Sequence, residues 1–68
     1  MTGVEFRSIR EKLRLTTEAW GRALGYRGNY ASVARQIRQY ESGQRPTPPW
    51  IARLAAMYGR HGVPEGWR

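Results

Sequence analysis

One segment in the middle of the chain concentrates side chains that can make paired hydrogen bonds to nucleic-acid bases. A guanidinium can bind O6 and N7 of guanine together, and a glutamine amide can bind N6 and N7 of adenine. On a helix that starts at Tyr30, the outer face contains no acidic residue, whereas a merely solvated face usually mixes glutamate with lysine. We therefore predict that this face reads base edges in the DNA major groove. Its predicted base-reading residues are Arg35, Gln39, Arg38, Ser32 and Gln36.

A helix in the major groove also needs contacts to the phosphate backbone, which fix its position without reading sequence. Thr16 and Thr17 stand where a preceding helix would begin, beside backbone amides that favour an anion. Thr16 is also in the N-cap position, so capping is its first role. Arg27 lies in the loop before the outer-face helix, and Gln44 and Arg45 lie in the loop after it. All five are predicted phosphate contacts.

Two helices are predicted before the helix that starts at Tyr30. The capping-box motif Thr2-x-x-Glu5 opens a first helix that runs to about Arg14. The second helix begins after Thr16 and ends at Gly25, a typical C-terminal glycine. Gly21 lies inside this helix, and we interpret it as a point of close approach by another helix. The inward residues of the two helices are Phe6, Ile9, Leu13, Trp20, Ala23 and Leu24.

The third helix, which carries the outer face described above, is predicted from its cap at Asn29 to Gly43. Glu41 falls on its core-facing side, where a carboxylate needs a partner. Arg10, at the border of the first helix's apolar stripe, is the natural partner, and the alternative is a separately solvated glutamate. The predicted inward residues of the third helix are Tyr30, Val33, Ala34, Ile37 and Tyr40.

A fourth helix is predicted between Thr47, as its cap, and Gly62, with Pro48 in the first turn. Its core stripe consists of Ile51, Leu54, Ala55 and Tyr58. Because no segment shows the alternation of a strand, the fold class is all-α. We expect one domain over residues 1–62 and a C-terminal tail over residues 63–68.

Composition excludes several other classes of protein. The chain has no cysteine or aspartate, and His61 is its only histidine, so we expect no metal site, no cofactor and no enzymatic activity. No apolar run is long enough for a membrane span, and no signal peptide is visible, which favours the cytoplasm. The net charge is +7, and of the 12 basic residues only Lys12 is not an arginine. This bias favours nucleic acid over the alternative of a generally basic surface.

Two stretches resemble the lambda-repressor/Cro-like, or XRE, helix-turn-helix family. The segment 15–26, LTTEAWGRALGY, is similar to the family pattern L-T-Q-E-E-L-A-x-x-L-G-V, and Ile37-x-x-Tyr40-Glu41-Ser42-Gly43 with Arg45-Pro46 is similar to I-S-R-W-E-x-G-x-R-x-P. The resemblance implies a compact bundle of four or five helices that binds operator DNA as a dimer. It further implies Thr17 as a phosphate contact, Arg35 and Gln39 as base readers, and an internal pair of Arg10 with Glu41. The segment from Tyr26 to Ser32 is longer than in the family pattern, which leaves its base contacts open.

These observations predict a sequence-specific regulator of transcription. We expect a repressor, acting on its own promoter, that binds a palindromic operator in double-stranded DNA as a homodimer. Stand-alone modules of this kind occur in phages and in anti-CRISPR operons, so a phage or anti-CRISPR-associated regulator is one sub-class. The alternative is an antitoxin or another module whose main role is to bind a partner protein, with Trp67 as an anchor. Trp67 could instead cover the domain's own core or lie in a dimer interface.

Overall fold

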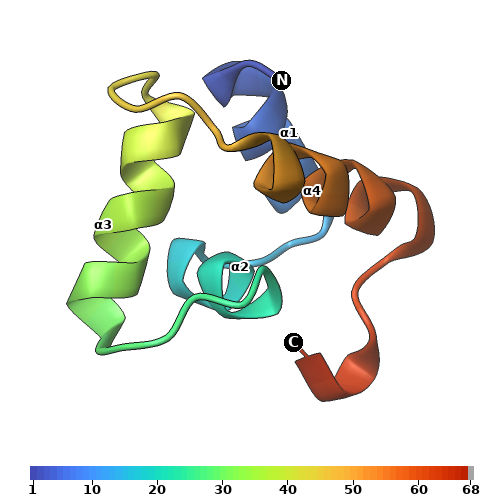
Figure 1. Ribbon diagram of the computed structural model, residues 1–68. Coiled ribbons are helices and arrows are strands. Elements are labelled where there is room, and N and C mark those ends of the chain that lie inside the picture. Colours follow the sequence, from blue (N-terminus) through green and yellow to red (C-terminus); the bar gives the residue numbers. More distant parts are fainter. Residues whose placement is uncertain (68) are drawn as a thin grey trace.

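The computed structural model describes residues 1–67, and within them the chain forms only helices and loops (Figure 1). Figure 1 shows α1 and α4 packed together on one side of the molecule, α3 on the opposite side, and α2 below them. This arrangement confirms the all-α fold class. The elements are α1 (Gly3–Lys12), α2 (Thr17–Ala23), α3 (Tyr30–Glu41), α4 (Pro49–His61) and η1 (Glu65–Trp67), a 3-10 turn.

The first three helices begin at the caps that the sequence predicts. Thr2 and Glu5 form a capping box, in which each side chain accepts a hydrogen bond from the other residue's backbone N–H, at 2.9 and 3.1 Å. The Thr16 hydroxyl accepts from the N–H of Ala19 at 3.1 Å. The Asn29 side chain accepts from the N–H of Ser32 at 2.9 Å. Each cap satisfies an amide that the helix itself leaves without a partner.

Two predicted helix boundaries are wrong. α1 ends at Lys12 rather than near Arg14, because Arg14 adopts a left-handed conformation with φ of 59°. Thr47 does not cap α4, which begins at Pro49 after Pro48 with no side-chain cap. Proline disfavours helical geometry in the residue before it, so Pro49 keeps Pro48 extended, with ψ of 145°.

Four aromatic rings, one from each α-helix, lie in the core beside buried aliphatic side chains. The ring of Phe6 lies 5.6 Å from that of Trp20 and 6.0 Å from that of Tyr40, measured between centroids. Tyr58 of α4 packs edge-on against Trp20 at 6.1 Å. These contacts join all four α-helices around one centre. Tyr30, which was predicted to face inward with Val33 and Tyr40, is instead 62% exposed.

Glycine allows two pairs of helices to approach closely. A Cβ atom on Gly21 of α2 would lie 2.4 Å from Cγ1 of Val33 on α3, so the predicted close approach at Gly21 is confirmed. A Cβ atom on Gly3 of α1 would lie 2.3 Å from the backbone oxygen of Glu41, a contact that sequence reasoning missed. Both glycines therefore allow α3 to pack closer to α1 and α2 than a larger residue would.

The chain continues against the core after α4. Gly62, with φ of 80°, ends α4 as predicted, and Val63 packs on the core cluster. Trp67, in η1, remains 59% exposed. Arg68, the last residue of the predicted tail, lies outside the described residues. Within residues 1–67, no helix has both the length and the apolarity that crossing a membrane requires.

Candidate nucleic-acid interface

The outer face of α3 carries a shallow hollow of about 360 Å³, named here the α3 hollow. Four of the five predicted base-reading residues line it, together with one predicted phosphate contact from the following loop. Among residues 1–67, no acidic side chain borders the α3 hollow, so its donors face solvent without an internal competitor. The lining residues are Ser32, Arg35, Gln36, Gln39 and Arg45.

The loop after α3 places Arg45 beside Gln39. The backbone oxygen of Gln39 accepts the N–H of Arg45 at 3.2 Å and the Ser42 hydroxyl at 3.2 Å. The same hydroxyl oxygen accepts the N–H of Gln44 at 3.3 Å. Gly43, with φ of 80°, allows the sharp reversal that these bonds require. The chain therefore turns back on the end of α3 and adds a cation to its outer face.

The structure separates Arg38 from the other predicted base-reading residues. Arg38 lines a second hollow of about 350 Å³, the α1–α3 hollow, where it joins the predicted phosphate contact Thr17. Arg7 also lines this hollow, although sequence reasoning gave it no role, because only the packing of α1 on α3 brings it there. Its complete lining is Arg7, Arg10, Thr17, Arg38, Glu41 and Ser42.

An ion pair occupies the floor of the α1–α3 hollow. Nε of Arg10 donates to Oε2 of Glu41 at 2.7 Å, and a second guanidinium nitrogen donates to Oε1 at 3.2 Å. The Arg10 guanidinium also donates to the backbone oxygen of Leu15 at 3.1 Å. The two side chains are only 15% and 9% exposed. The predicted Arg10–Glu41 pair is therefore present and is bidentate, the geometry that fits guanidinium to carboxylate best.

The two remaining cations of the α1–α3 hollow differ in their partners. Arg7 pairs with Glu11 across one helical turn at 3.3 Å, and both side chains are more than half exposed. Arg38 makes no ion pair with any residue among 1–67. An anion such as a DNA phosphate could therefore bind Arg38 beside the Thr17 hydroxyl.

The other predicted phosphate contacts are dispersed. Thr16 uses its hydroxyl for the cap on α2. Gln44 is exposed and lines neither hollow, and Arg27 lies at a third hollow, between α2 and α4. Of these five predicted contacts, Thr17 and Arg45 are the two that line one of the described hollows together with predicted base-reading residues. In the described part of the chain, no group of three or more acidic or histidine side chains could hold a metal ion.

Comparison with known protein families gives a match over most of the chain. A family model described as a helix-turn-helix domain matches residues 3–65. This match runs from the start of α1 to the first residue of η1. No curated protein and no solved structure was found to match the chain.

Proposed function

Since the chain belongs to the helix-turn-helix domain family, we propose that it regulates transcription by placing α3 in the major groove of double-stranded DNA. The observation that carries this proposal is the α3 hollow, where arginine, glutamine and serine side chains gather with no acid among them. Each of these side chains offers donors or acceptors that match base edges. An α-helix fits the width of the major groove, so α3 can approach the bases with this face.

The two hollows suggest that one part of the interface reads base edges and another part binds phosphate. Arg35 and Gln39 lie in the α3 hollow and read base edges, with Ser32 and Gln36 beside them. Arg38 lies in the α1–α3 hollow with Thr17, so in this proposal it binds phosphate on the flank of the groove. Such flank contacts fix the register of the helix without adding sequence information.

The proposal includes a homodimer on a palindromic operator. A single helix of 12 residues covers only a few base pairs, whereas two copies related by a two-fold axis read two half-sites about one helical turn apart. The regulator would act as a cytoplasmic repressor of its own promoter, in the manner of phage or anti-CRISPR-associated regulators. The cellular level of the regulator would then set the response.

Selection of bound fragments from random double-stranded DNA tests the proposal. We expect an enriched inverted repeat, bound more tightly than a scrambled fragment of the same composition at about 150 mM salt. The variant Arg60→Ala on α4 removes one positive charge from a surface outside both hollows and should keep the preference for the selected fragment. Recovery of no consensus, with equal affinity for the selected and scrambled fragments, would overturn the proposal. A non-palindromic consensus would keep DNA reading and exclude the symmetric dimer.

A further inference from the structure

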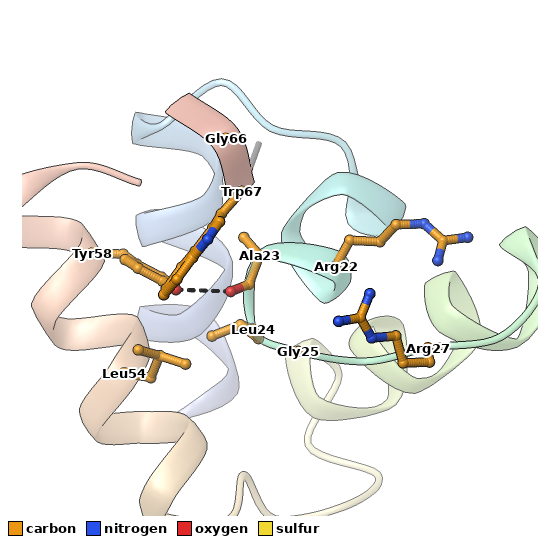
Figure 2. A pocket seen from close by; sticks show the side chains of 9 residues that line it. All are labelled: Arg22, Ala23, Leu24, Gly25, Arg27, Leu54, Tyr58, Gly66 and Trp67. Atoms are coloured by element: carbon orange, nitrogen blue, oxygen red, sulfur yellow. Dashed lines mark hydrogen bonds between the residues drawn. The ribbon is translucent and has the colours of Figure 1, made fainter. Parts of the chain in front are cut away.

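The largest of the described hollows, about 490 Å³ in volume, lies away from the outer face of α3. It opens between the C-terminal end of α2, the middle of α4 and η1, and we name it the α2–α4 hollow (Figure 2). Its volume lies within the range of about 300–1,000 Å³ that is usual for small-molecule sites. None of the interactions proposed for DNA accounts for it, apart from the predicted role of Arg27 at its edge.

The α2–α4 hollow has an apolar side. Leu24 and Tyr58, only 1% and 2% exposed, lie behind it, and the half-buried Leu54 forms one wall. The Tyr58 hydroxyl donates to the backbone oxygen of Ala23 at 2.8 Å, so its polar atom is already satisfied. Trp67 extends from η1 across this side (Figure 2). A ligand placed here would therefore meet hydrocarbon and aromatic rings rather than unpaired polar atoms.

The other side of the α2–α4 hollow carries two arginines, which differ in their availability. Arg22 pairs with Glu18 and donates to the backbone oxygen of Gly28 at 3.0 Å, and its side chain extends away from the apolar residues (Figure 2). Arg27 makes no ion pair and no side-chain hydrogen bond with any residue among 1–67. Because no acidic side chain from the described part of the chain lines the hollow, its electrostatic complement is an anion.

We propose that the α2–α4 hollow binds a small aromatic carboxylate, with its ring between Trp67 and Leu54 and its carboxylate on the Arg27 guanidinium. The apolar wall and the unpaired cation face one space, and an aromatic acid complements both at once. This inference goes beyond DNA binding and does not depend on it. The site also touches the loop that leads to α3, since Gly25 and Arg27 line it and Tyr26 bonds the Tyr40 hydroxyl of α3 at 2.8 Å.

The test uses indole-3-acetate as the probe, with tryptamine as a cationic control of similar shape. Nuclear magnetic resonance titration of the isotope-labelled chain follows the amides of Gly25 and Gly66 and the indole N–H of Trp67. We expect saturable shifts of these signals with indole-3-acetate, and binding of tryptamine at least about tenfold weaker. No saturable shift at millimolar probe, or equal binding of the two probes, would overturn the proposal.

Variants distinguish this site from nonspecific attraction to a basic chain. Arg27→Gln should weaken binding of indole-3-acetate by about tenfold, whereas Arg60→Gln, an exposed arginine outside the hollow, should leave it unchanged. Trp67→Ala should weaken binding, whereas Trp50→Ala, which removes another exposed indole from α4, should not. The proposal would be overturned if Arg27→Gln and Arg60→Gln, or Trp67→Ala and Trp50→Ala, changed the affinity for indole-3-acetate equally. Shifts of the same signals with protein concentration alone would also overturn it, since they would show that a second copy of the chain covers the hollow.

Discussion

The Arg10 guanidinium donates to both carboxylate oxygens of Glu41, at 2.7 and 3.2 Å, and thereby joins α1 to the last residue of α3. This pair removes the one acid of α3 from its outer face. It also neutralises Arg10 inside the protein, so Arg10 does not compete with Arg38 for an external anion. A single contact thus supports the fold and keeps the candidate interface basic.

Breaking this pair should destabilise the domain. Arg10→Met leaves a largely buried carboxylate without its partner, and we expect the free energy of unfolding to fall by about 2–4 kcal/mol. Urea unfolding followed by circular dichroism measures the change. The matched control is Arg7→Met, which breaks the exposed pair with Glu11 and should cost less than about 0.5 kcal/mol. Similar losses in the two variants would contradict a structural role for the Arg10–Glu41 pair.

The close contact of α2 with α3 at Gly21 gives a second prediction. Gly21→Ala adds a methyl group whose carbon would lie only 2.4 Å from Cγ1 of Val33, too close for the two atoms to remain where they are. Although alanine favours the helix by about 1 kcal/mol, overpacking costs about 1–3 kcal/mol, so we expect a net loss of stability. The double variant Gly21→Ala with Val33→Ala should lose less than the sum of the two single changes, because the new methyl fills the space that Val33 vacates. Additive losses would show that the two positions do not compete for the same space.

Two tyrosines predict how stability changes in alkaline solution. Burial raises the pKa of Tyr58 above the ordinary value of 10.0, and burial with the hydrogen bond to Tyr40 raises the pKa of Tyr26. The folded state therefore keeps these protons where the unfolded state has lost them. Stability is fully present below pH 10 and falls as the pH rises beyond it, by up to about 1.4 kcal/mol per unit for each tyrosine.

Denaturant unfolding between about pH 8 and about pH 11 measures this slope. Tyr58→Phe should make the slope shallower above pH 10, at a cost of about 1 kcal/mol at neutral pH from the lost bond to Ala23. Tyr30→Phe, at a ring that is 62% exposed, serves as the control and should not change the slope. If both variants keep the full alkaline slope, burial of Tyr58 is not its source.

Local signals predicted most of the helical framework. A cap such as Asn29 acts within one turn of its own helix, so the sequence around it is sufficient to locate the start of α3. The pair of Arg10 with Glu41 could also be predicted, because Glu41 falls on the core-facing side of its helix and Arg10 lies at the border of the apolar stripe of α1. By contrast, Thr47 failed as a cap because two prolines follow it, and the second keeps the first out of the helix.

Features that depend on how helices cross were not predictable from periodicity. Tyr30 shares a face with Val33, yet its ring is 62% exposed whereas Val33 is buried, because a helical wheel does not show how far along α3 its neighbours reach. The same holds for Arg7, whose place beside Arg38 follows from the packing of α1 on α3. The outer face of α3 was therefore predicted as a set of residues, but not its division into two hollows.

That division gives the sharpest test of the candidate interface, because Arg35 and Arg38 are the same residue type on the same helix. Arg35→Ala should cost about 1–3 kcal/mol on the selected DNA sequence and relax specificity at one position, since Arg35 lies in the α3 hollow. Arg38→Ala should weaken binding to selected and scrambled DNA alike, and should reduce the dependence of log K on log salt by about one phosphate contact. Affinities measured on both fragments over a range of salt concentrations separate the two outcomes. A position-specific loss for Arg38→Ala would return it to the base readers, and a uniform loss for Arg35→Ala would make it a phosphate contact.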